Sequence, residues 1–256
     1  MNKTPLLIIG IVLVIAVIGG MLYYNSTQPP SKASIDPAGT IKTPSTPATA
    51  KASPMSIPAN APSGANPPEQ MGSPNAAVTL EEFADFQCGA CAGAHPTMNE
   101  IKSIYGSRIH FIYRNFPLQI PAHDKSYEAA LAASAAGMQN KFWDMQNMLF
   151  SNQKAWTSDP TYKQIWKGYA QKIGLDVPKW EADMNGFGAK NRVEADIARG
   201  KAINISSTPT LFINGVSVSF SDMRVEALKP LIDAELQKST GQNPAGAPAG
   251  GESSSK

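Results

Sequence analysis

Two cysteines, Cys88 and Cys91, are the only thiols in this chain of 256 residues, and Gly89 and Ala90 separate them. A disulfide across so short a loop would add only about 2 kcal/mol to stability in the chain-entropy model, so the pair is better suited to react than to staple. A cysteine in the first turn of a helix faces unpaired N–H groups and the positive end of the helix dipole, which favour the thiolate. The spacing therefore predicts thiol–disulfide exchange, with Cys88 as the nucleophile and Cys91 as the resolving thiol.

The segments on either side of the cysteines predict the order strand, reactive turn, helix. Residues 78–87 have strand-like alternation up to Cys88, and residues 92–105 have helical spacing that stops at Gly106. Residues 109–115 predict a second strand. Because the connection to it is short, we expect it to lie parallel to the first in a right-handed βαβ unit.

The second half of the chain predicts a helical stretch followed by a hairpin. Asn214 and Gly215 lie between the strand-like residues 210–213 and 216–218, which is a strong hairpin signal. A closing helix is expected over residues 223–237. The helical spacing before the hairpin predicts helices over residues 127–138, 142–150, 162–173 and 189–203. The expected fold class is therefore α/β, with the order βαβ, helical insert, ββα.

In this order of elements, residues 76–238 resemble the DsbA-like family of thiol–disulfide oxidoreductases. The resemblance implies a thioredoxin fold with a helical domain inserted at about residues 118–203. The stretch VTLEEFADFQC, residues 78–88, is similar to that family's first strand and its approach to the active site. Pro96 is similar to the kink-forming helix proline of thioredoxins.

A second motif, Ser-Thr-Pro-Thr at residues 207–210, carries the same resemblance. Thioredoxin-like proteins have a cis-proline at this place, before the hairpin and facing the cysteines. The resemblance therefore implies that Thr208 and Pro209 belong to the site and that the Thr208 backbone docks a substrate chain as a short strand. A trans proline at the start of a strand is the alternative.

Glu82 is a further candidate site residue. It shares strand parity with Val78 and Leu80, which predicts a carboxyl in apolar surroundings beneath the helix. The resemblance implies that this acid moves protons to and from Cys91, and a surface glutamate on an edge strand is the alternative. Asp85 receives no role, since we expect it to be solvated. Residues 89 and 90 offer no side-chain donor to the thiolate, so the direction of the redox reaction stays open.

The first 24 residues predict a single membrane anchor. Pro5 to Tyr24 is an uncharged run of 20 residues, and a helix of that length spans about 30 Å, the thickness of a bilayer core. The run does not end in the small residues of a signal-peptide cleavage site, although a cleaved signal is the alternative. Disulfide chemistry favours placing the folded domain on the extracytoplasmic side of the cell membrane.

Two flanking segments differ in composition from the domain. Residues 25–75 are rich in Pro, Ser and Ala, which predicts a disordered tether, and residues 239–256 predict a disordered tail. The net charge of the whole chain is +2, and acidic and basic residues balance from residue 76 onward. This balance argues against nucleic acid as a partner.

Other function classes stay open. Cys88, Cys91 and His95 could supply three ligands of a copper or zinc chaperone, although a solvated helix-face histidine is the more common role for His95. A reductase, an isomerase or a holdase that uses the helical insert are further alternatives. No cofactor is expected. The expected partners are exported proteins with free cysteines and a membrane protein that recycles the disulfide, and the expected oligomeric state is a monomer.

Overall fold

A computed structural model describes residues 54–241 of the chain. The predicted anchor, residues 1–24, and the tail beyond Gly241 lie outside the described residues. Within residues 54–241 no helix is both long and apolar enough to span a membrane.

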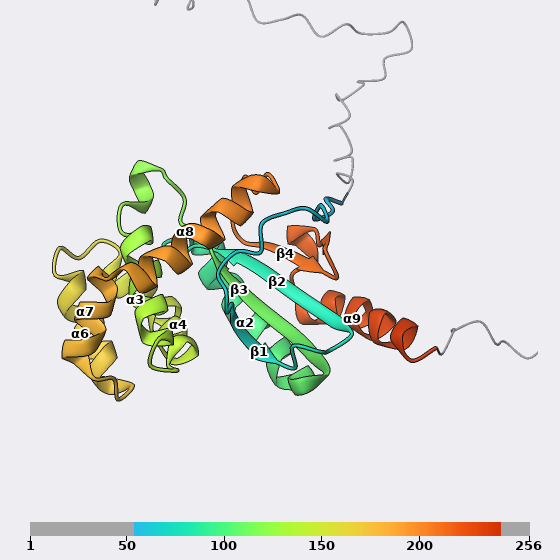
Figure 1. The fold of residues 1–256 in the computed structure, drawn as a ribbon, viewed down its shortest axis with the longest axis horizontal. Helices are drawn as coiled ribbons and strands as arrows, with labels where there is room; N and C mark the ends of the chain where they lie inside the picture. Colours follow the sequence, from blue (N-terminus) through green and yellow to red (C-terminus); the bar gives the residue numbers. More distant parts are fainter. Residues whose placement is uncertain (1–53, 242–256) are drawn as a thin grey trace, which may run out of the picture. The chain divides into compact units, whose positions relative to one another are not determined.

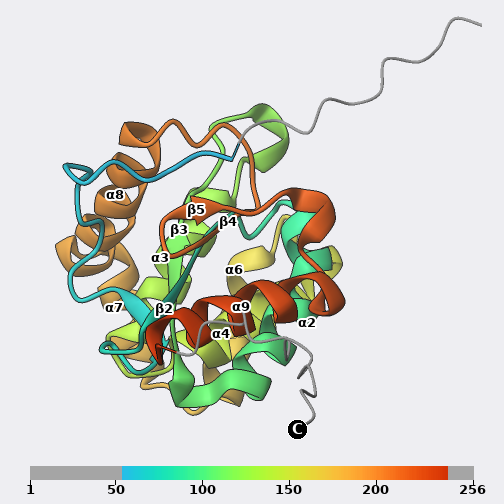
Figure 2. The ribbon, with the colours of Figure 1, turned by 90° about the vertical axis from the view of Figure 1, so that its right-hand side faces the viewer.

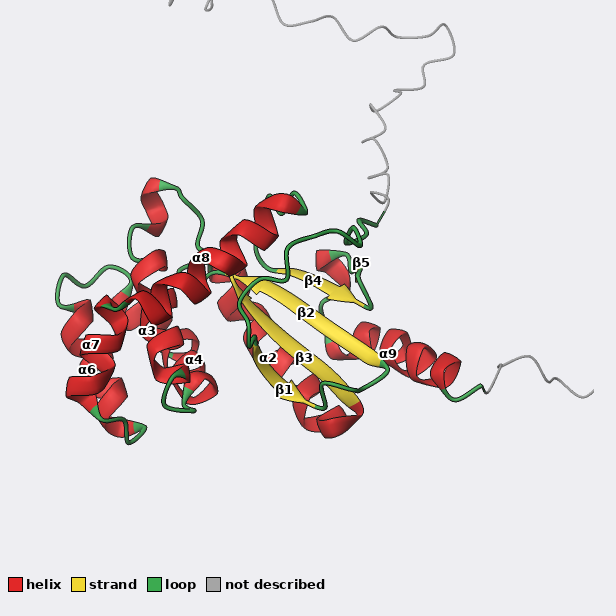
Figure 3. Ribbon diagram, in the orientation of Figure 1, coloured by secondary structure: helices red, strands yellow, loops and turns green. Residues whose placement is uncertain are grey.

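Within the described residues, five strands form one sheet in the order β1-β3-β2-β4-β5 (Figure 1 and Figure 3). The central strand β2 pairs parallel with β3 and antiparallel with β4, and β1 pairs antiparallel with β3. The strands are β1 Glu69–Gly72, β2 Val78–Ala84, β3 Ile109–Asn115, β4 Thr210–Ile213 and β5 Val216–Ser217. The parallel pairing of β2 and β3 is the predicted βαβ unit.

Helices cover the sheet and extend beyond it. Helix α2, Gly89–Tyr105, connects β2 to β3, and α9, Val225–Ser239, packs beside it on one face of the sheet (Figure 2). Between β3 and β4 lies the helical insert, which Figure 1 shows to one side of the sheet. Its helices are α3 Ser126–Gly137, α4 Phe142–Ser151, α5 Gln153–Trp156, α6 Tyr162–Lys172, α7 Val177–Asn185 and α8 Phe187–Ala202.

Alternation along β2 separates two apolar layers. Val78 and Leu80 belong to the core beneath α2 and α9, while Phe83 belongs to a smaller cluster on the opposite face. That second cluster contains Phe83, Phe116, Ile203, Ile205 and Phe212. Because β2 is buried on both faces, its charged residues also need partners inside the protein.

The insert packs around the alanine-rich helix α3, which contacts α4, α7 and α8. The small side chains of α3 let its neighbours approach closely, and larger residues fill the space around it. The chain's four tryptophans all lie in the insert: Trp143, Trp156, Trp166 and Trp180. The last three of these are almost fully buried.

The folded part begins before Ala76, which corrects the predicted boundary at that residue. Strand β1 pairs with β3, and Ser56 forms a bridge with Val216 at the other edge of the sheet. The composition of residues 25–75 predicted a tether because it contains few large apolar side chains. Residues 54–75 are instead held through their backbone groups, by strand pairing and by buried arginines.

Those arginines belong to an ion-pair network on the face of the sheet opposite α2. Arg114 pairs with Glu81 at 2.6 Å and with Asp196 at 3.0 Å, and Arg199 pairs with Glu81 at 2.7 Å. Arg114 also donates to the carbonyl of Ala65. The network therefore joins β2, β3, helix α8 and the N-terminal segment. A single-sequence pattern could not predict these pairings, since the partners are far apart in the chain.

Candidate active site

The two cysteines lie at the start of α2, at the end of β2. Cys88 is the N-cap residue, and its carbonyl accepts the first helical hydrogen bond from the Ala92 N–H. Cys91 is 1% exposed, whereas Cys88 is 9% exposed. Both are free thiols. Strand β2 and the helix turn thus place one sulfur near the surface and the other beneath it.

The surroundings of the two sulfurs move their pKa values in opposite directions. A hydrogen bond from the Cys91 thiol, helped by the backbone N–H groups of Ala90 and Cys91, lowers the pKa of Cys88 to about 5 against the effect of burial. Burial raises the pKa of Cys91 well above its ordinary value, and the nearby Cys88 raises it further. Of the two thiols, Cys88 therefore ionises at the lower pH, as expected for the predicted nucleophile.

Thr208 and Pro209 lie beside Cys88, although they are about 120 residues away in sequence. The Cys88 sulfur lies 3.2 Å from the Thr208 carbonyl oxygen, which accepts a hydrogen bond from Cys88 when the thiol is protonated. The peptide bond between Thr208 and Pro209 is cis, as the resemblance implied. The loop before β4 therefore covers one side of the Cys88 sulfur.

Glu82 is buried on the α2 side of the central strand, not at an edge. Burial raises the pKa of its carboxyl to about 7, and Lys102 of α2 opposes that shift. Burial likewise lowers the pKa of Lys102 to about 8, and its ammonium lies 4.3 Å from the centroid of the Trp143 ring. Glu82 is close enough to Cys91 for its charge to raise the pKa of that thiol. The structure thus places near Cys91 a buried acid whose pKa is raised toward neutral pH.

Asp85, expected to be solvated, is buried with its side chain 0% exposed. Its carboxylate accepts four hydrogen bonds, from the backbone N–H groups of Gln87 and Leu118 and from the side chains of His123 and Ser126. The prediction failed because three of these donors, those of Leu118, His123 and Ser126, come from the loop after β3 and the start of α3. The sequence pattern does not show that this loop folds back over the end of β2.

The insert also contacts the active-site turn through Gln153 of α5. The Gln153 amide donates to the carbonyl of Phe86 at 2.8 Å and to the carbonyl of Cys88 at 3.0 Å. The side chain therefore bridges the two residues on either side of Gln87. Sequence reasoning missed Gln153, and no local pattern distinguishes it from other helix glutamines.

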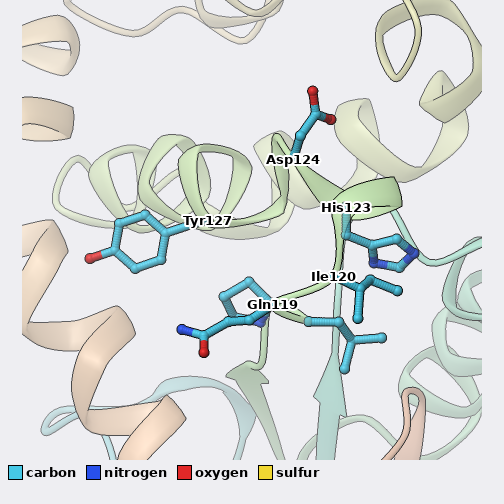
Figure 4. A pocket seen from close by; sticks show the side chains of 7 residues that line it. Gln119, Ile120, His123, Asp124 and Tyr127 are labelled. Carbon is cyan, nitrogen blue, oxygen red and sulfur yellow. The ribbon is translucent and has the colours of Figure 1, made fainter. Parts of the chain in front are cut away.

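A pocket lies between the loop after β3 and the start of α3 (Figure 4). One of its lining residues, Asp124, accepts a hydrogen bond from Gln87, the neighbour of Cys88. This contact places the pocket beside the active-site turn. The lining residues are Pro117, Leu118, Gln119, Ile120, His123, Asp124 and Tyr127.

His95 differs from its expected place on a solvated helix face. It is 6% exposed and hydrogen bonded to Asn147 at 2.9 Å, and burial lowers its pKa to about 4. Among residues 54–241 no three His, Cys, Asp or Glu side chains are grouped so that they could hold a metal ion. His95 is therefore a packed residue of the insert interface and not a third ligand beside the cysteines.

The aromatic and methionine side chains that a holdase could use are largely core, as their helical spacing predicts. Phe142, Met145 and Phe150 are buried between α4 and its neighbours, while Met138 is 42% exposed. These aromatic and methionine side chains hold the insert against α2 and β3.

Fold and site together define a two-cysteine protein of thioredoxin type with a helical insert between β3 and β4. A family model described as Thioredoxin matches residues 66–234, so the chain belongs to the thioredoxin family. The match begins before β1, in agreement with the earlier start of the folded part.

Solved structures share this fold at low sequence identity. BdbD from Bacillus subtilis has a TM-score of 0.61 and 22% identity, over 72% of this chain and 99% of its own. The thiol–disulfide exchange protein α-DsbA2 from Wolbachia pipientis has a TM-score of 0.56 and 19% identity, over 66% of this chain and 87% of its own. The predicted resemblance to DsbA-like proteins is confirmed at the level of the fold.

Curated relatives match a shorter part of the chain. The Na⁺/H⁺ antiporter NhaA 1 of Mycolicibacterium gilvum is 33% identical over 146 residues, which is 56% of this chain and 23% of the antiporter. The antiporter NhaA of Herminiimonas arsenicoxydans is 32% identical over 144 residues, 56% of this chain and 22% of its own length. This chain thus spans less than a quarter of the length of these relatives.

Proposed function

We propose that this chain is an extracytoplasmic thiol–disulfide oxidoreductase that forms disulfides in exported proteins by exchange through Cys88 and Cys91. The observation that carries the proposal is the difference in pKa and in burial between the two sulfurs at the start of α2. Cys88, whose pKa is lowered to about 5, lies next to the Thr208 carbonyl, and Cys91 is buried beneath it. One sulfur can therefore react with a substrate while the other resolves the mixed disulfide.

The low pKa of Cys88 also supports the oxidising direction. A thiolate stabilised at the helix start makes the reduced state more stable, and a more stable reduced state makes the disulfide a stronger oxidant. Residues 89 and 90 do not add a side-chain donor, so the stabilisation comes from Cys91 and the backbone. Reduction and isomerisation are the alternative directions.

The proposed location and partners follow from the chemistry and the N-terminal sequence. The uncharged run Pro5 to Tyr24 would anchor the chain in the cell membrane, and disulfide formation requires an oxidising compartment outside the cytoplasm. Substrates would be exported proteins with free cysteines. A membrane protein would reoxidise the pair, and the chain would act as a monomer.

Two measurements test the proposal. The first is oxidative refolding of a reduced secreted protein, which the oxidised chain should accelerate and a Cys88→Ser variant should not. The second is equilibration of Cys88 and Cys91 with glutathione mixtures, where a potential near about −120 mV indicates an oxidant and one near about −270 mV a reductant. Failure to exchange disulfides with any protein thiol would refute the proposal.

A metal chaperone is a second candidate with less support, because His95 is bonded within the insert interface. Titration of the reduced chain with copper and zinc distinguishes it. Tight metal binding that persists when His95 is replaced but requires both cysteines would support the metal-chaperone function.

A further inference from the structure

We propose that the backbone N–H of Asp85 stabilises the Cys91 thiolate during disulfide exchange, and that His123 is a positioning residue that holds this N–H in place through the Asp85 carboxylate. The inference rests on the proposed function and adds participants to the same site. It begins from the contact between the Asp85 N–H and the Cys91 sulfur, 3.5 Å apart.

The need for such a donor follows from the exchange step. When a substrate thiolate attacks Cys88 in the disulfide state, a new bond joins the substrate sulfur to Cys88 and the bond to Cys91 breaks. The electron pair of the broken bond stays on Cys91 as a thiolate. Cys91 is 1% exposed, so water does not solvate that charge. A fixed N–H group at the sulfur stabilises the charge where it develops.

Two sets of contacts hold the Asp85 N–H in place. The carbonyl of the same peptide unit, that of Ala84, accepts from the Phe116 N–H at 2.9 Å, and the side chain of Asp85 anchors the residue itself. The buried carboxylate accepts four hydrogen bonds and could not rotate without leaving its charge unpaired. On the other side of the residue, the Asp85 carbonyl accepts from the Cys88 N–H at 3.1 Å. Asp85 is thus held at its side chain and at its carbonyl, and its N–H is directed at Cys91.

His123 is the donor whose removal tests this arrangement best. Two of the four donors, Gln87 and Leu118, use backbone N–H groups that a substitution cannot remove. His123 donates through its ring Nδ1 at 2.6 Å, and its ring lines the pocket shown in Figure 4 with 14% of its side chain exposed. Ser126 offers the second removable donor, at 2.5 Å.

The test follows the two thiols separately in the full-length chain. Reduced protein is mixed with dithiobis-nitrobenzoate, which releases a first coloured thiolate when Cys88 attacks the reagent. It releases a second when Cys91 attacks the mixed disulfide on Cys88. The rate of the second phase, measured across a pH series, reports the thiolate form of Cys91 without any protein substrate.

His123→Ala should slow the second phase roughly tenfold at neutral pH, the factor expected for one hydrogen bond to a charged group, and should move its pH midpoint upward. The first phase should stay as in the parent. His123→Asn should keep the parental second phase, because its amide nitrogen can take the place of Nδ1. His110→Ala is the matched control, since His110 contacts Gln70 near the opposite end of β3.

A second phase with parental rate and pH midpoint in His123→Ala would overturn the inference, as would a His123→Asn variant that is as slow as His123→Ala. If His123→Ala does not fold, Ser126→Ala is measured instead, with the same slowing expected and parental kinetics counting against the inference. Failure of the proposed function is visible separately. In that case the parent shows both phases but does not oxidise protein substrates.

Discussion

At the scale of single residues, the two sulfurs behave differently because their surroundings differ. Cys88 receives hydrogen bonds from Cys91 and from the first turn of α2, whereas Cys91 lies in the core with Glu82 nearby. The position of a cysteine at a strand-to-helix turn was enough to predict the first of these effects. The depth of Cys91 and the partner of Glu82 depend on residues distant in the chain.

We expect thiolate absorbance of the reduced chain to show one transition near pH 5, and Cys88→Ser to remove it. Cys91→Ser should instead accumulate mixed disulfides with substrates, since the resolving thiol is gone. Non-reducing gels of cells that express each variant give the comparison. A low-pH transition that persists in Cys88→Ser would show that the thiolate does not belong to Cys88.

Glu82→Gln should stabilise the protein at alkaline pH and have little effect in acid. Burial raises the folded-state pKa of Glu82 from 4.5 to about 7. An acid with a raised folded-state pKa contributes stability below its unfolded pKa and loses that contribution as pH rises through the folded value. The variant, which cannot ionise, should therefore gain roughly 1–3 kcal/mol over the parent at pH 8.

Denaturant unfolding at pH 4.5 and pH 8 measures the difference. Equal stability of the two proteins at both pH values would show that Glu82 is not desolvated in solution. The same variant should slow disulfide exchange, because it removes the acid that, as the resemblance implies, moves protons to and from Cys91.

At the scale of elements, the helical insert supports the redox turn. Asp85 and Gln87 at the end of β2 receive hydrogen bonds from residues around the start of α3, and Gln153 of α5 donates to two carbonyls of the turn. The turn between β2 and α2 is therefore held from the side by an element that the minimal βαβ and ββα units do not contain.

Gln153→Ala should lower the free energy of unfolding by about 1–2 kcal/mol, since two partly buried carbonyls lose their donor. It should also raise the pKa of Cys88, because the helix start that stabilises the thiolate is less firmly held. Urea unfolding and thiolate absorbance measure the two effects. Gln171→Ala, at an exposed position of α6, is the control. A Gln153→Ala variant that behaves like this control would show that Gln153 does not stabilise the turn.

Most of the elements could be predicted from local pattern. Helical spacing predicted α2, α3, α4, α6, α8 and α9 within a few residues, and the Asn-Gly pair predicted the hairpin of β4 and β5. Strand β1 was missed because it has only 4 residues and lies in a Pro-rich stretch. Helix α7 was missed because its spacing is weak. Pairing with β3 and packing against α3 stabilise these two elements, and neither is visible locally.

For the site, too, local sequence pattern predicted some residues and missed those that depend on tertiary contacts. Cys88 and Cys91 could be predicted from spacing and context, and Thr208 and Pro209 from the resemblance. Asp85, Lys102, His123 and Gln153 were missed as members of the site. Each of them becomes part of it only when distant segments meet, so their roles are tertiary in origin.

At the scale of the whole molecule, the segment before β2 is part of the domain. Residues 54–75 supply an edge strand and carbonyl acceptors for two arginines, through Ala65 and Pro62. They also supply Glu69, which pairs with Arg192 of α8. The segment therefore contacts both edges of the sheet and the insert.

Removing this segment should destabilise the fold strongly. A chain of residues 76–241 should unfold with roughly 3 kcal/mol less free energy than residues 54–241, because buried ionic partners are left unpaired. Guanidinium unfolding followed by circular dichroism makes the comparison. Coincident unfolding curves would show that the stable domain begins at Ala76.

Because of where its tryptophans lie, the fluorescence of this molecule reports on the helical insert and not equally on the sheet. All four indoles lie in the insert, and Trp156, Trp166 and Trp180 are buried in it, so intrinsic fluorescence records the insert together with the contact of Trp143 with Phe111 of β3. Circular dichroism, in contrast, averages over the backbone of both parts. In a two-state transition the two signals coincide. Any separation between them in a variant would therefore reveal an insert that melts independently of the sheet, without an extrinsic dye or label.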